Sequence, residues 1–282
     1  MDLSIIIITW NSQDHIRACL DSIIRVERPV GCEVLVIDNA SSDDTVQIVR
    51  LSHPQICLIP NRQNLGYARA NNQGIEKSTG RYVLLLNPDT EIRENALDLI
   101  LKHMDANPDV GALGPKLLNP DGSVQPSRRE FPRFSTLLWE FTGLSRLFPK
   151  SRIFGRWRMG YFDFDRTAEV DQPMGSCLIL RRETLKQVGV FDETFPMFFN
   201  DVDLCYRIEA AGWKIFYYPD AQVTHHRGAS TSKAKRKMIW FSHLAFYRFF
   251  RKHKTGPGNR LLLLLLWIPL VLAAVPRMIV KR

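Results

Sequence analysis

Apolar runs rich in β-branched residues recur through the first third of the chain, and stretches with apolar residues at helical spacing separate them. Such runs predict buried strands, and the intervening stretches predict helices. The predicted strands are Leu3–Thr9, Glu33–Asp38, Ile56–Pro60 and Tyr82–Leu86. Alternation of strand and helix is typical of a mostly parallel sheet flanked by helices. The pattern therefore predicts an α/β fold for the first half.

The periodicity weakens between Leu118 and Asp171, where Pro, Arg and aromatic residues are frequent. We interpret this stretch as loops and short helices that cover a site. Regular patterns return further on. They predict strands at Cys177–Leu180 and Lys214–Tyr218, and helices at Arg182–Val188 and Asp201–Ala211.

The C-terminal tail has a basic part and an apolar part. Lys233–Lys254 mixes Lys and Arg with apolar residues at helical spacing, as in a basic amphipathic helix on anionic lipid. Leu261–Pro276 then carries no polar side chain, yet a membrane span needs about 20 apolar residues. We expect an in-plane or single-span anchor, with a core helix of the globular domain as the alternative. The predicted division is an α/β domain over 1–232 and a membrane-associating tail over 233–282.

The charge distribution supports this division. The chain has 282 residues, 45% of them hydrophobic, and 38 Lys and Arg against 29 Asp and Glu give +9. The residues after Asp220 comprise 13 basic and no acidic ones. Residues 1–220 therefore carry 25 basic and 29 acidic residues, which is a net charge of −4. A nucleic-acid-binding protein would carry its basic patch on the folded body. We therefore expect no nucleic-acid partner and a membrane surface instead.

Cysteine usage and the N-terminus both indicate a cytosolic body. The five cysteines are odd in number and form no C-x-x-C pair, so neither a disulfide framework nor a zinc site is indicated. No basic region precedes the short apolar run Ile5–Ile8, which favours a first strand over a signal peptide. The predicted location is the cytoplasmic face of the cell membrane.

Two carboxylates stand at the ends of predicted strands, where open α/β sheets bind ligands. Asp38 ends one strand in "VLVIDNASSDDT" and Asp89 follows another in "LLLNPDT". Either one alone could be a turn former. Together with "NLGYARANNQG", where Gly66 permits close backbone approach before a helix N-terminus, they indicate a nucleotide-sugar pocket. The dinucleotide and P-loop fingerprints are both missing, which argues against dehydrogenases and P-loop enzymes.

The second half adds an acidic and a histidine motif. In "MFFNDVDLCYRIEAAGW", Asp201 and Asp203 begin a predicted helix, where they could either catalyse or favour the positive helix end beside an Asn200 cap. In "VTHHRGAS", His225 and His226 could provide loop polarity, or an imidazole ligand to a metal held by Asp89.

Taken in order, the motifs resemble the family-2 inverting glycosyltransferases of GT-A fold, especially the bacterial rhamnosyltransferase-like branch that builds cell-wall and surface polysaccharides. The resemblance runs from Leu3 to about Ser230. It is carried by "SIIIITWNS", "VLVIDNASSDDT", "NLGYARANNQGI", "LLLNPDT", "FDETFPMFFNDVDLCYRIEAAGW" and "HHRGAS". So many motifs in one order make the resemblance highly specific, and it implies a GT-A type sheet with the basic and apolar tail appended.

The resemblance also implies the roles of individual residues. Asp201 matches the general base of the family's E-D motif, with Asn200 in place of Glu. In "NPD", Asn87 replaces the first acid of the D-x-D motif, so Asp89 is left as the carboxylate ligand of Mg²⁺ or Mn²⁺, and His225 completes the metal site. Substrate binding falls to Thr9, Asn11, Asp38 and Asn39 around the nucleoside, to Asn64, Gly66 and Asn71 near the ribose and diphosphate, and to Asn87.

The implied reaction is inverting, metal-dependent transfer of a sugar from a dTDP-, UDP- or GDP-linked donor. L-Rhamnose from dTDP-rhamnose is the specific candidate, and the acceptor is lipid-linked or a polysaccharide. Sugar-phosphate nucleotidyltransferases are one alternative, but they carry a Gly-rich basic loop after the first strand, where this chain has "TWNSQDH". A catalytically silent GT-A-fold membrane adaptor is the other, and the presence of both Asp89 and Asp201 argues against it.

Overall fold

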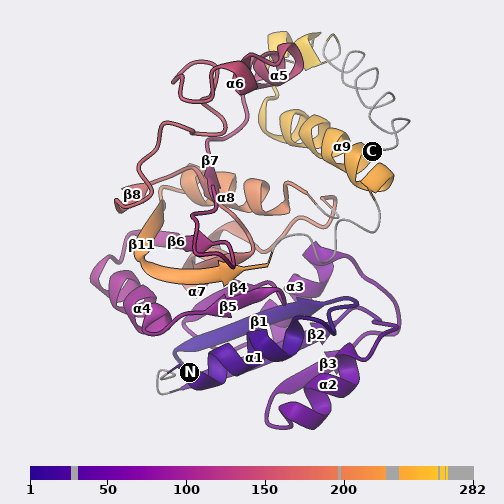
Figure 1. The fold of residues 1–282 in the computed structure, drawn as a ribbon. Helices are drawn as coiled ribbons and strands as arrows, with labels where there is room; N and C mark the ends of the chain where they lie inside the picture. The colour runs from indigo at the N-terminus through magenta and orange to yellow at the C-terminus, as the bar shows by residue number, and fades with distance from the viewer. Residues whose placement is uncertain (27–30, 196–197, 227–234, 260, 264, 266–282) are drawn as a thin grey trace.

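A mixed sheet that is nine-stranded in the described part of the chain forms the centre of the molecule (Figure 1). The structure is a computed structural model, and it describes residues 1–26, 31–195, 198–226, 235–259, 261–263 and 265, with the side chains of 141 and 235–240 left out. The strand order is β3-β2-β1-β4-β10-β6-β11-β5, and β8 pairs with β11. Two further short strands, β7 and β9, pair outside this sheet.

The strands and helices alternate as follows. The strands are β1 (Leu3–Thr9), β2 (Cys32–Asp38), β3 (Cys57–Pro60), β4 (Tyr82–Leu86), β5 (Thr90–Ile92), β6 (Val110–Leu118), β7 (Arg128–Arg129), β8 (Ala168–Glu169), β9 (Gln172–Pro173), β10 (Cys177–Arg181) and β11 (Lys214–His225). The helices are α1 (Ile16–Arg25), α2 (Thr45–Ser52), α3 (Tyr67–Lys77), α4 (Ala96–Ala106), α5 (Phe134–Thr142), α6 (Leu144–Leu147), α7 (Arg182–Val188), α8 (Asn200–Ala210) and α9 (Lys235–His253).

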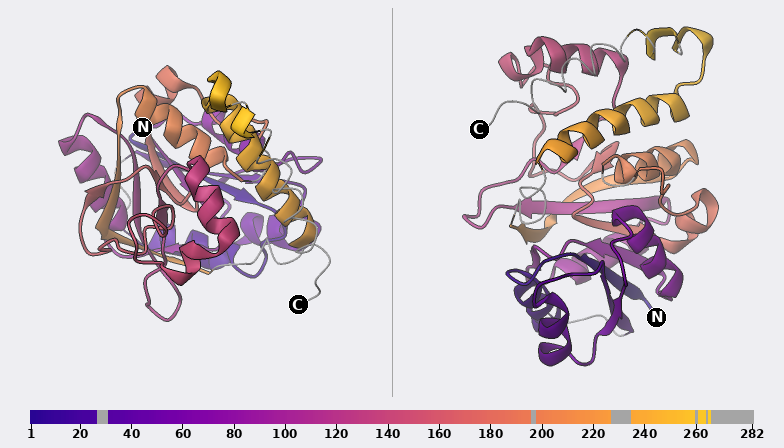
Figure 2. Two further views of the ribbon diagram at one scale, coloured as in Figure 1. Left: turned by 90° about the horizontal axis from the view of Figure 1, so that it is seen from above. Right: turned by 90° about the vertical axis from the view of Figure 1, so that its right-hand side faces the viewer.

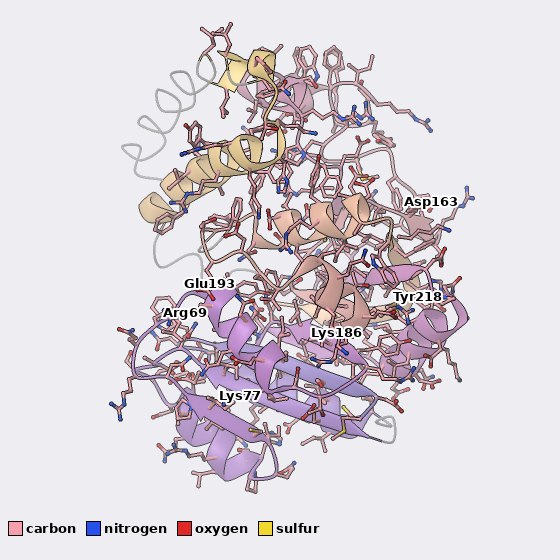
Figure 3. The ribbon with its side chains drawn as sticks, turned by 180° about the vertical axis from the view of Figure 1, so that it is seen from behind. Arg69, Lys77, Asp163, Lys186, Glu193 and Tyr218 are labelled. Atoms are coloured by element: carbon pink, nitrogen blue, oxygen red, sulfur yellow. The ribbon has the colours of Figure 1, made fainter. Side chains whose placement is uncertain are left out.

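Both faces of the sheet are covered by helices. Along β1, Ile5 and Ile7 belong to one hydrophobic cluster with α1, α2 and α4, whereas Ile6 belongs to a second cluster with α3, α7 and α8. A strand buried on both faces reads as a continuous apolar run, which is what "SIIII" shows. On the second face, the Asn72 side chain fastens α3 to the 191–193 segment, because it accepts from the Phe191 amide (3.0 Å) and donates to Glu193 (3.1 Å). Glu193 is labelled in Figure 3, together with Arg69 and Lys77 of α3.

The strand directions bring the predicted site residues to one edge of the sheet. β1, β2, β3 and β4 run parallel, so their carboxyl ends lie side by side. β10 runs antiparallel to β4 with Cys177 opposite Leu86, and its beginning therefore meets the end of β4. β11 ends beside β5, with His225 opposite Thr90. This convergence of strand ends creates the space for a ligand.

The sequence predicted most of these elements correctly. All four strands of the first half are present within one residue of the predicted bounds, and the weak stretch 118–171 contains loops, short strands and the short helices α5 and α6. β6 was not predicted, because Gly111, Gly114 and Pro115 disguise a strand that is buried along its whole length. The strand predicted at Lys214–Tyr218 continues to His225 through a register irregularity between Tyr218 and Gln222.

The tail begins as the expected helix but packs against the body. Ala245 and Phe249 of α9 belong to the same hydrophobic cluster as α8, and Lys252 and His253 bind the buried Asp203. The predicted boundary at 232/233 and the apolar residues 266–276 lie outside the described residues. Within the described part, no helix is long and apolar enough to cross a membrane.

Candidate active site

A cavity of about 570 Å³ lies where the strand ends converge. This volume is in the usual range for a site that binds a small molecule. Its walls come from the end of β1, the loops after β2 and β4, the start of α3, the segment before β10, the start of α8 and the end of β11. Thr9, Asn39, Asn64, Gly66, Asn87, Asp89, Asp201 and His225 are the predicted site residues that line it.

One wall carries a carboxylate and an imidazole in close proximity. Asp89 Oδ1 lies 3.4 Å from His225 Nε2, and both side chains are largely buried. Gln125, which is fully buried, holds the imidazole from behind: its Nε2 donates to the His225 carbonyl (2.7 Å) and its Oε1 lies 3.0 Å from His225 Nδ1. Because the amide is oriented by the first bond, Nδ1 must donate to Oε1. In the neutral imidazole this arrangement leaves the lone pair of Nε2 on the side of Asp89.

This arrangement fits a divalent cation. Two lone-pair donors that face each other at 3.4 Å leave a place for a shared positive charge, and an amide behind the imidazole is the support that metal-bound histidines require. No group of three His, Cys, Asp or Glu that could hold a metal occurs among the residues described. Mg²⁺ and Mn²⁺ commonly take their remaining ligands from substrate phosphates and water, so two protein ligands suffice.

Another part of the cavity lining, the start of α8, carries Asp201, the predicted base. Its Oδ2 accepts from Gln172 Nε2 and from the Gly175 amide, both at 3.2 Å, and its Oδ1 accepts from the Val202 amide at 2.9 Å. Burial raises the pKa of Asp201, although the amides of Val202 and Gly175 oppose that rise. A buried carboxylate with a raised pKa is a suitable proton acceptor for a hydroxyl.

Gly175 has a defined role beside this carboxylate. A Cβ at position 175 would lie only 3.1 Å from Asp201 Oδ2 and 3.2 Å from its Cβ. Glycine therefore allows the backbone amide to approach the carboxylate closely enough to donate.

The nucleoside side of the cavity is shaped by a network of loop bonds. Thr9 Oγ1 donates to Asp38 Oδ1 (2.8 Å), and Asp38 also accepts from the amide and hydroxyl of Ser41. Asn39 accepts from the Leu65 amide and donates to the Gly66 carbonyl, both at 3.4 Å. These bonds join the ends of β1 and β2 to the start of α3.

Gly66 adopts φ +81°, a backbone conformation that favours glycine, and its amide donates to Asn64 Oδ1 (2.9 Å). Asn64 and Gly66 therefore form the turn that starts α3 at the cavity.

Three predicted substrate-binding residues do not line the cavity. Asn11 accepts from the Ser42 amide (2.8 Å), Asp38 is engaged with Thr9 and Ser41, and Asn71 donates to the Tyr67 carbonyl (2.9 Å). Each of these side chains supports a loop or helix that does reach the cavity. Their direct contact with a nucleoside or diphosphate stays a prediction.

Asp203 and His226, which share motifs with Asp201 and His225, do not line the cavity. Asp203 is fully buried and pairs with Arg207 (2.9 Å), Lys252 (2.7 Å) and His253 (2.7 Å), which fastens α9 to α8. His226 Nε2 binds Glu91 (2.7 Å). Asn200 is not the cap of α8, because Phe199 occupies that position with φ +66°.

Several cavity residues were missed from the sequence. Tyr67 donates from its hydroxyl to the Gly175 carbonyl (3.1 Å), and Met174, Ser176, Phe198 and Phe199 complete the wall near Asp201. Tyr67 could have been found, because it directly follows the Gly66 turn. Gln125 gave no signal, since it lies in the aperiodic stretch 118–171 and meets His225 only through the fold.

Parallel strand ends thus converge on a cavity whose lining includes a carboxylate beside an imidazole and a second, buried carboxylate, as expected for a GT-A-type glycosyltransferase. The family described as Glycosyl transferase family 2 matches residues 4–188. The chain belongs to this family and is a glycosyltransferase.

Known relatives agree with this assignment. The chain is 33% identical over 270 residues to the N-acetylglucosaminyl-diphospho-decaprenol L-rhamnosyltransferase of Mycobacterium tuberculosis, covering 90% of this chain and 85% of that protein. It is 30% identical over 211 residues to the low-salt glycan biosynthesis hexosyltransferase Agl10 of Haloferax volcanii, covering 73% of this chain and 61% of that protein.

Solved structures share the fold. The mannosyltransferase PcManGT from Pyrobaculum calidifontis, in complex with GDP-Man and Mn²⁺, has a TM-score of 0.60 at 21% identity, with 98% of this chain and 71% of that chain covered. TarS 1-349 of S. aureus, in complex with UDP-GlcNAc, has a TM-score of 0.55 at 20% identity, with 87% and 65% covered. Both likenesses support the GT-A-like sheet predicted from the sequence.

Proposed function

We propose that the protein is a metal-dependent, inverting rhamnosyltransferase that transfers L-rhamnose from dTDP-rhamnose to a lipid-linked diphosphate acceptor at the cytoplasmic face of the membrane. The observation that supports this proposal is the cavity itself, whose lining includes the Asp89–His225 pair and the buried Asp201. The M. tuberculosis relative supports the sugar and the acceptor class, since its name contains both.

In this proposal Asp89 and His225 hold Mg²⁺ or Mn²⁺. The bound cation would stabilise the negative charge that develops on the nucleoside diphosphate as it leaves. Gln125 keeps the His225 ring in the tautomer that can bind a metal. The PcManGT and GalNAc-T7 structures, both with Mn²⁺, support a divalent cation in proteins of this fold.

Asp201 accepts the proton of the acceptor hydroxyl while that hydroxyl attacks the anomeric carbon from the side opposite the diphosphate. Attack on the far face in a single displacement inverts the anomeric centre. General-base catalysis of this kind contributes about 10²–10⁴ in rate. The Gly175 amide and Gln172 hold the carboxylate in place through their donations to Oδ2.

The surroundings of Asp201 suit an anionic acceptor. Arg129 follows the buried Arg128 in β7 and faces Gln172 of β9, whose side chain donates to Asp201. Its guanidinium carbon lies 4.4 Å from the centre of the Trp157 ring, which fixes its direction. Burial raises the pKa of Asp201, and the charge of Arg129 is among the effects that oppose this rise. An acceptor diphosphate would find a cation here.

The proposal is tested by donor binding. Calorimetry of the full chain with Mn²⁺ should show preference for dTDP-rhamnose over UDP- and GDP-sugars, and a chelator should abolish the binding. Donor binding that is unchanged by the chelator would contradict the metal role of Asp89 and His225. Preference for a UDP- or GDP-sugar would refute the rhamnosyl donor and leave the metal role standing.

A further inference from the structure

Large apolar side chains are exposed mainly at one end of the molecule. Seven of the twelve such side chains in the described residues lie on α5, α6, the loop after α6 and the 261–265 segment. Leu147 is 69% exposed, Phe148 48% and Ile153 65%. Figures 1 and 2 show these segments together, at the end of the molecule farthest from α2 and β3. Single exposed apolar residues need no explanation, but a concentration of them marks a binding surface.

These segments are held in place by packing against one another and against α9. Leu137 of α5, Phe250 of α9 and Leu263 form one buried cluster, and the Phe134 ring stacks on Phe250 at 4.4 Å. Phe154 anchors the loop after α6 on α5, because its ring lies 5.0 Å from that of Trp139. The exposed side chains are therefore presented outward by an ordered base.

The same segment is basic. Residues 141–162 contain five Arg or Lys and no Asp or Glu, and Arg146, Lys150 and Arg152 alternate with the exposed apolar residues. Glu130 and Glu140, which pack beside this segment, bind Arg156 and Arg158 respectively, and in the described part of the chain Arg146, Lys150 and Arg152 form no ion pair. Apolar tips interleaved with cations are the chemistry that binds an anionic lipid headgroup layer.

We propose that Arg146, Leu147, Phe148, Lys150, Arg152 and Ile153, here called the α6 face, dock the protein on an anionic membrane. Leu263 packs on Leu137 of α5, the helix that leads into the α6 face, and Leu261, Leu262 and Leu265 are exposed. These three leucines would add to the same lipid contact, so docking would use two regions far apart in sequence.

A chain of aromatic contacts links the cavity to the segment that follows the α6 face. From the cavity, the Phe199 ring contacts Phe246 of α9 at 4.4 Å, and Phe246 contacts Trp157 at 5.5 Å, next to Arg129. A membrane held against α5 and α6 would present a lipid-linked head group toward Asp201. The presentation of a lipid-linked acceptor to Asp201 rests on the proposed function. Membrane docking itself can be measured without donor or acceptor.

The test is flotation of the purified full chain with vesicles of equimolar phosphatidylglycerol and phosphatidylcholine. Removing each cation should weaken binding about fivefold, so the variant Arg146→Gln/Lys150→Gln/Arg152→Gln should bind on the order of 100-fold more weakly. The variant Leu147→Ser/Phe148→Ser/Ile153→Ser should bind at least about tenfold more weakly. Wild type should prefer these vesicles to pure phosphatidylcholine.

A matched control removes exposed apolar side chains elsewhere. Leu51→Ser/Val190→Ser changes residues that are 73% and 38% exposed on other parts of the surface, and it should bind vesicles like wild type. Donor binding and thermal unfolding verify that each variant is folded. Wild-type vesicle binding by the apolar variant overturns the proposal; if its melting temperature also changes, the α6 face is covered by the chain itself.

Discussion

Gln125→Leu is the substitution that most specifically tests the arrangement behind the metal site. Gln125 is fully buried and makes two bonds to one residue, with its Nε2 donating to the His225 carbonyl and its Oε1 accepting from Nδ1. Leucine has a similar volume and can do neither. The imidazole is then free to change tautomer or to rotate, and its Nε2 no longer has to face Asp89.

The expected magnitude follows from these two bonds. Loss of a supporting partner behind a metal-bound histidine costs about 10–100-fold in metal affinity. Two buried polar groups also lose their partners, at about 1–3 kcal/mol each, so the free energy of unfolding should fall by roughly 2–5 kcal/mol. The assay is a Mn²⁺ titration by calorimetry or paramagnetic resonance with nucleoside diphosphate present, below the melting temperature of the variant.

Gln125→Glu is the matched control. Its carboxylate can still accept from Nδ1, but it has no donor for the His225 carbonyl. It should therefore lose stability like the leucine variant while keeping Mn²⁺ affinity within about threefold of wild type. A folded Gln125→Leu protein with wild-type Mn²⁺ affinity would refute the account of how His225 is oriented.

Three further outcomes are expected. Because burial raises the pKa of Asp201, the acid limb of kcat/KM for transfer should lie above the usual aspartate range near pH 4, and a limb at or below about pH 4 would contradict its role as base. Asp203→Asn should lower the free energy of unfolding by about 3–5 kcal/mol, because its buried ion pairs are lost. The kcat of the folded fraction should stay nearly unchanged. A folded variant with lost turnover would show that docking of α9 matters for the chemistry. Gly175→Ala should lower kcat about tenfold by displacing the Asp201 carboxylate while Mn²⁺ affinity stays at the wild-type value, and an unchanged kcat would show that the close approach is dispensable.

The stability contribution of Asp203 has a defined pH dependence. Burial acts to raise its pKa, but His253 and Lys252 outweigh this, so the pKa of Asp203 is lowered on folding. A lowered folded-state pKa means that the stabilisation is complete above the pKa of the unfolded chain, near 4, and is lost as the pH falls through the folded value. Acid unfolding of Asp203→Asn should lack this component.

Local patterns predicted the first half of the fold because each element there is continuous in sequence. β1 and β4 are buried on both faces and therefore appear as uninterrupted apolar runs, and Asp89 follows directly after β4. β6 is equally buried, but Gly114 lies where a Cβ would meet Pro173 at 2.3 Å. That constraint comes from packing between distant segments and has no local signature.

The site residues also differ in whether a local motif reveals them. Asp89, Asp201 and His225 belong to recognisable motifs and all line the cavity. Gln125, which holds His225, comes from the aperiodic stretch 118–171, and Gln172, which holds Asp201, follows directly after it in the two-residue strand β9, so only the fold reveals them. Conversely, Asp203 resembles a catalytic residue in sequence, and its three partners Arg207, Lys252 and His253, two of them in α9, identify it as structural.

The most direct test of the central claim compares Asp201→Asn with wild type in two measurements on the same preparations. One is transfer of rhamnose from dTDP-rhamnose to a lipid-linked diphosphate acceptor, and the other is Mn²⁺-dependent donor binding. The account predicts that transfer falls by about 10²–10⁴ while donor affinity stays within about twofold, because the base acts only on the acceptor hydroxyl. Transfer at the wild-type rate, with donor binding intact, would contradict it.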